Sequence, residues 1–81
     1  MNDDKLVRCF TEALGISQGI VNDELAYRSI PEWDSVGHMA MIAALENEFD
    51  VMLDTDDIIA MSDFGKAKSI LTKYGVAFGA S

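Results

Sequence analysis

The fold is decided by residues 33–49, which read WDSVGHMAMIAALENEF. From position 35 onward, side chains suited to a core recur at steps of three and four residues, as on the inner face of a helix: His38, Met41, Ile42, Leu45 and Phe49. The side chain of Asp34 or Ser35 can accept hydrogen bonds from the free backbone N–H groups of the first turn, and the charge of Asp34 suits the positive end of the helix dipole. The pattern predicts a helix from about Ser35 to Phe49.

The same helix carries a second apolar line on another side, formed by Val36, Met39, Ala40 and Ala43. A helix that is apolar on most of its circumference is usually buried on most of it. A domain of 81 residues, however, can rarely surround one of its own helices. Two interpretations stay open. Either short neighbouring helices cover this line, or it is an exposed, methionine-containing strip that suits weak contacts with varied partners.

Three further helices are predicted on either side of this stretch. Residues 3–14 repeat apolar side chains at helical spacing and are followed by Gly15, which favours a helix end. Residues 55–60 read as a short helix, and residues 63–74 as a longer one. The expected capping residues are Asn2 or Asp3 for the first of these helices, Asp54 or Thr55 for the second and Ser62 for the third.

Between the first two helices, residues 16–34 show no period and contain glycine, asparagine and proline, which predicts a long loop. Its apolar side chains can pin the loop to the core, and a short helical turn is expected near residues 23–26. No strand-like alternation of useful length occurs. The sequence therefore predicts an all-α fold, a small four-helix bundle with a long first loop and a short third helix. This single domain is expected to span residues 1–75, with a flexible tail at 76–81.

The balance of charge excludes some classes of function. The chain carries fourteen acidic and six basic residues, for a net charge of −8, and residues 32–63 hold nine of the acids and no lysine or arginine. This sign argues against binding to nucleic acid and to anionic membrane surfaces, which need basic side chains. The acidic segment is either a solvated face that maintains solubility or a docking surface for basic partners.

Two further features indicate the cellular compartment of the protein and the covalent bonds that its cysteine can form. The longest apolar run, residues 39–45, is far too short to span a bilayer, and the N-terminal residues lack the pattern of a signal peptide. Cys9 is the one cysteine, so neither an internal disulfide nor a thiolate zinc site is expected. We expect a monomeric, cytoplasmic protein in which Cys9 is a small side chain at the edge of the core.

Two motifs that would indicate chemistry fail on their spacing. The acidic run from Asp54 begins like a calcium loop, but Ile58 and Ile59 stand where a ligand and the required glycine should be. Ser35 and His38 lie one helical turn apart, yet one helix supplies neither an oxyanion hole nor a substrate cleft. We therefore expect no metal site and no catalytic residue, and a partly buried, hydrogen-bonded His38.

Ser35 can have either of two roles at the start of this helix. Capping is the commonest role of a serine that follows an aspartate and precedes an apolar run. Alternatively, its hydroxyl accepts a covalent modification, because the unpaired N–H groups and the dipole at a helix start stabilise an attached phosphate.

Residues 33–39, WDSVGHM, and residues 44–50, ALENEFD, resemble the acyl carrier protein family. The family's signature is Asp-Ser-Leu at the start of the second helix, with a Leu-Glu-x-x-Phe run toward the end of that helix. The resemblance extends from Leu6 to Tyr74 and includes an acidic turn before the short third helix. Val36 stands where the family usually has leucine, a change that keeps an apolar contact beside the serine.

The resemblance implies that Ser35 carries a 4′-phosphopantetheine arm, transferred from coenzyme A by a phosphopantetheinyl transferase (holo-ACP synthase). The thiol of the arm would hold an acyl or aminoacyl group as a thioester, and Asp34 would assist the metal-dependent transfer. The protein would not be an enzyme. It would visit acyl-transferring or acyl-activating enzymes with basic docking patches, as in fatty acid, lipid or polyketide biosynthesis. The expected docking residues are Val36, Met39, Ala43, Glu46, Glu48, Asp54, Asp56 and Asp57.

Two positions depart from the family's pattern. Gly37 and Ala40 stand where carriers of fatty acid synthesis often have acids, which favours a dedicated carrier of a specialised pathway. The alternative, from another functional class, is an unmodified acidic adaptor that binds partner proteins through the second helix.

Overall fold

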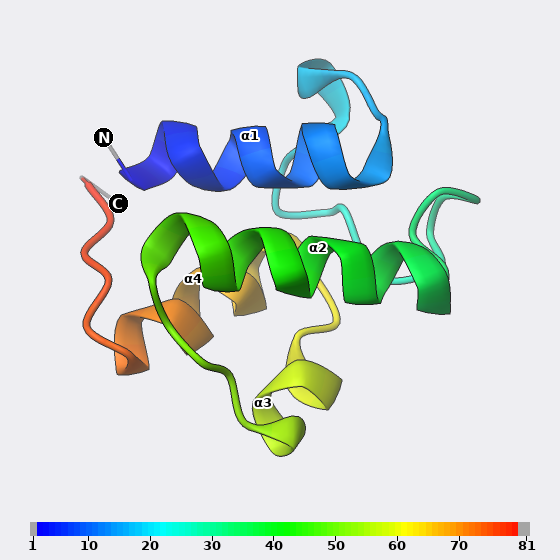
Figure 1. Ribbon diagram of the computed structural model, residues 1–81. Coiled ribbons are helices and arrows are strands. Elements are labelled where there is room, and N and C mark those ends of the chain that lie inside the picture. Colours follow the sequence, from blue (N-terminus) through cyan, green and yellow to red (C-terminus); the bar gives the residue numbers. More distant parts are fainter. Residues whose placement is uncertain (1, 80–81) are drawn as a thin grey trace.

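The computed structural model describes residues 2–79 and shows a mostly helical molecule measuring 30 × 27 × 19 Å (Figure 1). Within these residues the only strand-like feature is an isolated bridge between Ala26 and Asp63. The predicted all-α fold and all four predicted helices are confirmed; two have the predicted bounds, and the bounds of the other two differ by one residue. The elements are α1 (Asn2–Leu14), the 3-10 turn η1 (Gln18–Ile20), α2 (Ser35–Phe49), α3 (Thr55–Ala60) and α4 (Phe64–Lys73).

The helices pack around one apolar core. Figure 1 shows α1 and α2 side by side and running in opposite directions, with α4 behind α2 and the short α3 below it. Three aromatic rings join the elements at the centre of the core: the Phe10 ring meets Trp33 edge-on at 5.3 Å and Phe64 at 5.0 Å between ring centroids. Trp33 comes from the long loop, so the loop supplies part of the core. No helix within the described residues is long and apolar enough to cross a membrane.

The starts of α2 and α4 are capped by aspartate side chains, whereas the Asp54 side chain makes no capping bond at the start of α3. Asp34 Oδ1 accepts a hydrogen bond from the Gly37 N–H at 2.8 Å, and Asp63 Oδ1 accepts one from the Lys66 N–H at 2.7 Å. The expectation that Ser62 caps α4 is therefore wrong, because an aspartate one position later reaches the first turn. The Ser62 hydroxyl instead accepts a hydrogen bond from Lys66 Nζ.

The loop between α1 and α2 is held by backbone hydrogen bonds. The N–H of Tyr27 donates to the carbonyl of Ser62 at 2.8 Å, and the N–H of Phe64 donates to the carbonyl of Leu25 at 2.9 Å. These bonds fasten the loop to the segment before α4. The helical turn in this loop lies at η1, earlier than the predicted 23–26, where the chain forms only a turn.

The segment after α4 packs against the core, which corrects the prediction of a flexible tail for residues 76–79. Val76 is buried, and the Phe78 ring lies 6.2 Å from that of Phe49. The chain also bonds to the start of α1: Asn2 Nδ2 donates to the carbonyl of Ala77, and the N–H of Gly79 donates to Asp3 Oδ1, both at 2.7 Å. Residues 80 and 81 lie outside the described part of the chain.

Candidate functional site

Ser35 is the first residue of α2 and its side chain is exposed. Capping is done by the preceding Asp34, whose backbone is extended (φ −103°, ψ −168°) and whose carboxylate accepts from Gly37. None of the side-chain hydrogen bonds formed by residues 2–79 involves the Ser35 hydroxyl. Of the two roles that the sequence allows, capping belongs to Asp34, and the Ser35 oxygen is left free and reachable from solvent.

The surroundings of this hydroxyl fit an anionic group attached to it. The first hydrogen bond within α2 runs from the His38 N–H to the Asp34 carbonyl, so the N–H groups of Ser35 and Val36 have no partner inside the helix. Free N–H groups and the positive end of the helix dipole stabilise negative charge. Ser35 would hold a phosphopantetheine arm through a phosphodiester, and its exposure leaves the hydroxyl reachable from solvent.

Gly37 allows the loop to pass close to the first turn of α2. A Cβ atom at this position would overlap the carbonyl oxygen of Glu32 and lie 3.1 Å from Leu14 Cδ2. A glycine is therefore required where the loop and the end of α1 meet α2. By comparison with the family's pattern, Gly37 stands out only as a position that lacks an acid. Its one signal in the sequence is a glycine inside an otherwise helical pattern.

His38 is partly buried and hydrogen-bonded, as predicted. Its Nδ1 accepts from the indole N–H of Trp33 at 2.9 Å, and its Nε2 lies 2.8 Å from the carbonyl oxygen of Ile58. Since both ring nitrogens are engaged within the fold, His38 has none left to activate the Ser35 hydroxyl. A hollow of about 230 Å³ lies beside the ring and is lined by Tyr27, His38, Ile59, Met61 and Ser62.

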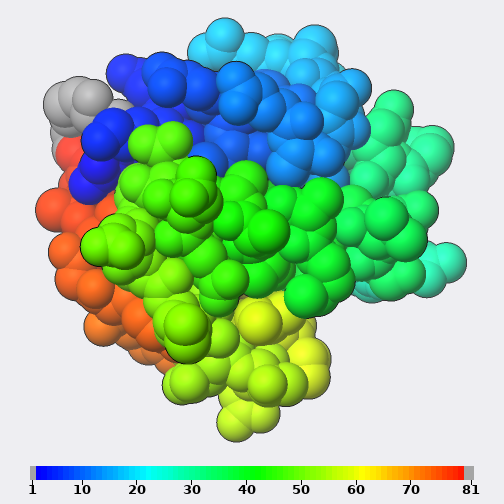
Figure 2. Space-filling model, in the orientation of Figure 1, coloured from blue at the N-terminus to red at the C-terminus, as the bar shows by residue number. Residues whose placement is uncertain are grey.

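The second apolar line of α2 is exposed. Val36 is 78% and Met39 54% exposed, and Ala40 and Ala43 also face solvent. Figure 2 shows the outer face of α2 uncovered by other elements along its length. Of the two interpretations of this line, the exposed strip is the one that the structure shows. Ile59 of α3, which the sequence does not mark as a docking residue, is 73% exposed and lines the same hollow as His38.

The predicted docking acids do not form one surface. Asp54 and Asp56 are exposed at the start of α3. Glu46 is half-buried, and its Oε2 accepts from the Leu53 N–H at 2.9 Å, which holds the loop after α2. Glu48 is exposed but lies near Cys9 of α1, where its charge helps to raise the pKa of the thiol.

The prediction that Asp57 takes part in docking is wrong, because its side chain is buried. Its Oδ1 accepts from Lys73 Nζ at 2.8 Å and its Oδ2 accepts from the Tyr74 hydroxyl at 2.6 Å. The hydrogen bond from Lys73, with that from Tyr74, lowers the pKa of Asp57, and the same contacts raise the pKa of Lys73 and of Tyr74. Asp57 therefore joins α3 to the end of α4.

Replacing Asp57 by asparagine is expected to lower the urea midpoint of unfolding at neutral pH. Because the folded pKa of Asp57 is lowered, its contribution is present above the ordinary aspartate pKa of about 3.9 and is lost as the pH falls through the folded value. The difference between the variant and the wild type should therefore shrink below about pH 4. Urea titrations followed by circular dichroism measure it, with the exposed Asp56→Asn as the matched control. Equal midpoints for the two variants at neutral pH would contradict a structural role for Asp57.

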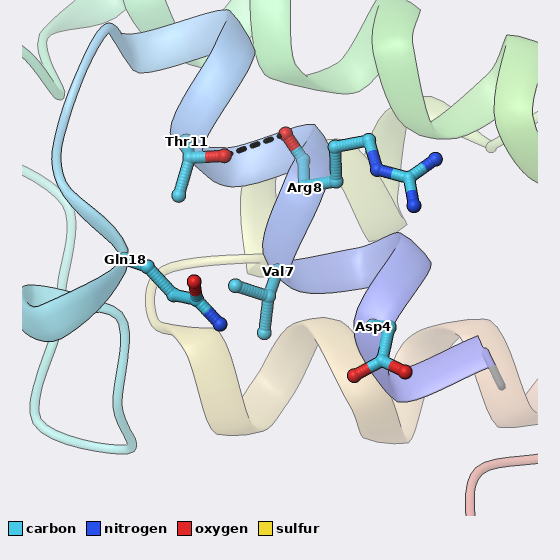
Figure 3. Close-up of a pocket in the computed structure, with 5 residues that line it drawn as sticks. All are labelled: Asp4, Val7, Arg8, Thr11 and Gln18. Atoms are coloured by element: carbon cyan, nitrogen blue, oxygen red, sulfur yellow. Dashed lines mark hydrogen bonds between the residues drawn. The ribbon is translucent and has the colours of Figure 1, made fainter.

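Within residues 2–79, the other polar and nucleophilic groups do not gather into a second site. A hollow of about 340 Å³ lies beside α1 and is lined by Asp4, Val7, Arg8, Thr11 and Gln18. In Figure 3, Gln18 points toward Val7, while the charged ends of Asp4 and Arg8 lie apart. Cys9 is buried, and burial raises the pKa of its thiol to about 11. Residues 2–79 contain no group of three or more histidine, cysteine, aspartate and glutamate side chains that could hold a metal ion.

Comparison with known proteins returned no match to a protein-family model, to a curated protein or to a solved structure.

Proposed function

We propose that this protein is an acyl carrier protein, which carries acyl or aminoacyl intermediates as thioesters on a 4′-phosphopantetheine arm attached to Ser35. The observation that supports the proposal most is the free, exposed hydroxyl of Ser35 beside a helix cap supplied by Asp34. If Ser35 capped α2, attaching a group to its oxygen would cost a capping bond, worth about 1 kcal/mol. Because Asp34 makes that bond, modification leaves the helix start intact.

In this proposal the arm supplies the thiol, and the chain supplies an attachment point and a surface for partners. Asp34 holds the first turn of α2 in shape, and the N–H groups of Ser35 and Val36, which have no partner inside the helix, would stabilise the charge of an attached phosphate. The resemblance in sequence adds the motif Asp34-Ser35-Val36 at the start of the second of four helices. The absence of acids at Gly37 and Ala40 favours a specialised pathway over housekeeping fatty acid synthesis.

The partner surface in this proposal combines the exposed apolar strip with the exposed acids of α3. Val36 and Met39 offer a shallow apolar contact next to Ser35, and Ile59 adds an exposed apolar side chain on α3. Asp54 and Asp56 attract basic patches on the transferase and on acyl-handling enzymes, which speeds encounter without requiring tight binding. A carrier must also leave each partner. Weak binding allows this, because differences in affinity lie mostly in the rate of dissociation.

Incubation with coenzyme A and a broad-specificity phosphopantetheinyl transferase tests the proposal. Intact-mass spectrometry should show the addition of one phosphopantetheine group to the wild type and none to Ser35→Ala. Ser17→Ala is the matched control, because Ser17 is also exposed at a helix start and makes no capping bond. It should be modified like the wild type. A wild type that gains no mass, or equal addition to Ser35→Ala, would overturn the proposal and favour the unmodified adaptor.

Reversing the charge of the α3 acids is expected to slow this modification. The double variant Asp54→Lys, Asp56→Lys should react about tenfold more slowly at low salt, and the difference should shrink as salt is added. The matched control, Asp23→Lys, Glu24→Lys, changes the net charge equally at exposed positions of the long loop and should react at nearly the wild-type rate. Equal rates for the two double variants across the salt series would remove the α3 acids from docking.

A further inference from the structure

Two hollows border the start of α2, one lined in part by His38 and the other in part by Asp34. The second lies on the side of the long loop and has a volume of about 460 Å³. Its lining residues are Arg28, Ser29, Ile30, Pro31, Trp33 and Asp34. We call it the loop hollow. Because Ser35 directly follows Asp34, a group attached to the Ser35 oxygen begins next to this hollow.

Hydrogen bonds fix the wall of the loop hollow. The Arg28 N–H donates to the Trp33 carbonyl at 2.8 Å, and the Trp33 N–H donates to the Ile30 carbonyl at 3.2 Å. The Ser29 hydroxyl donates to the Ala26 carbonyl at 2.6 Å and accepts from the Ala26 N–H at 3.0 Å. The Trp33 side chain is fully buried in the core. The hollow is therefore preformed, and filling it does not require the loop to become ordered.

Arg28 supplies the positive charge of the loop hollow. It is the only lysine or arginine between Arg8 and Lys66, and its side chain is exposed. Within residues 2–79 it forms no ion pair, although Asp34 lines the same hollow. Its guanidinium carbon lies 5.9 Å from the centroid of the Tyr27 ring, a cation–π contact that limits its movement. The guanidinium therefore keeps its N–H donors for an anion.

The hollow beside His38 offers less to a negatively charged group. No lysine or arginine lines it, and Lys66 nearby bonds to the Ser62 hydroxyl. Both nitrogens of the His38 ring are engaged within the fold. This hollow measures about 230 Å³, against about 460 Å³ for the loop hollow. Charge and size therefore both favour the loop hollow as the place for an anionic group that extends from Ser35.

We propose that the phosphodiester and the adjoining part of the pantetheine arm lie in the loop hollow, and that Arg28 is the residue that positions the phosphate. This inference rests on the proposed modification of Ser35. The Arg28 guanidinium donates charge-assisted hydrogen bonds to the phosphate oxygens. Ile30 and Pro31 offer apolar contact to the two methyl groups that follow the phosphate in the arm. The positive charge also offsets the repulsion between the phosphate and the Asp34 carboxylate.

NMR spectra recorded before and after modification test the position of the arm. Intact mass first shows that the group has been added, so a failure to modify Ser35 is distinguished from a failure of the arm to dock. After the addition, the Ile30 N–H signal should shift, and nuclear Overhauser effects should connect the methyl groups of the arm to Ile30 and Pro31. Contacts of these methyl groups with Ile59 and Met61 instead, or amide shifts confined to Ser35 and its two neighbours in the chain, would overturn the proposal.

Substitution of Arg28 measures its contribution to docking. Arg28→Asn removes the charge and suits the left-handed backbone at this position, where φ is 67°. The ratio of docked to free arm, measured from the Ile30 shift, should fall by about two- to fivefold, the effect of one exposed ion pair. Arg8→Gln is the matched control, because Arg8 is also exposed but lines the hollow beside α1. It should dock the arm like the wild type, and equal ratios for the two variants would contradict the role of Arg28.

The salt dependence of the wild type gives a test that needs no substitution. Docking should weaken as salt is raised from about 0.01 M to about 1 M, over which the Debye length falls from about 30 Å to about 3 Å. Arg28→Lys keeps the charge but not the planar group of donors, so its ratio should lie between those of the wild type and Arg28→Asn. These two measurements serve if Arg28→Asn does not fold. An Ile30 shift that is independent of salt would overturn the proposal.

Discussion

Trp33→Ala should lower the free energy of unfolding by about 3–5 kcal/mol, a large share of the roughly 5–15 kcal/mol that stabilises a folded domain. The side chain is fully buried between α1 and the loop, and its ring meets Phe10 edge-on and stacks on His38 at 6.1 Å. Truncation leaves a large apolar cavity and removes the donor that holds His38 Nδ1. The loss therefore combines packing with a broken hydrogen bond between the loop and α2.

Urea unfolding followed by circular dichroism measures this effect, because the variant lacks the fluorescent ring. Trp33→Phe is the control: it keeps an aromatic ring against Phe10 but not the indole N–H, so its loss should be clearly smaller than that of the alanine variant. A Trp33→Ala protein within about 1 kcal/mol of the wild type would contradict the central place of this ring in the core.

Gly37→Ala should destabilise the protein, although the same change inside a helix ordinarily stabilises it by about 1 kcal/mol. The new Cβ would overlap the carbonyl oxygen of Glu32, which belongs to the backbone and cannot rotate away as a side chain does. The loop or α2 must shift, at a cost of about 1–3 kcal/mol for overpacking. We expect a net loss of stability and a weaker contact between the loop and the start of α2.

Gly65→Ala provides the matched comparison within the same chain. Gly65 also lies in the first turn of a helix, but its Cβ would meet only side-chain oxygens, those of Asp63 at 3.4 Å and Asp23 at 3.9 Å, which are ordinary contacts. This variant should be as stable as the wild type or slightly more stable. Urea midpoints of the two variants give the test, and a Gly37→Ala protein that matches or exceeds Gly65→Ala would show that the loop adjusts freely.

The sequence predicted those features that depend on neighbours along the chain. The spacing of Met41, Ile42 and Leu45 identified the inner face of α2, and Asp34 before Ser35 marked its start. The surplus of apolar residues on α2 also predicted an exposed strip, since so few elements are available to cover a helix. Each of these inferences needs only the helical period and the chemistry of a cap.

Contacts between distant residues were not predictable in the same way. Asp57 reads as a first-turn acid like Asp56, and only the arrival of Lys73 and Tyr74 from α4 turns it into a buried anchor. His38 was expected to be hydrogen-bonded, but the identity of its partners follows from the path of the loop and the position of α3. Such contacts depend on tertiary packing, which no local pattern encodes.

The pairing of the first and last described segments has a practical consequence for engineering. Asn2 and Asp3 bond to residues 77–79, so both ends meet at one side of the molecule, away from the start of α2 (Figure 1). A fusion partner attached beside either of these segments would lie on the side away from the Ser35 hydroxyl. A short linker could equally join the two segments, with new termini cut into the exposed part of the long loop, to give a circular permutant of residues 2–79.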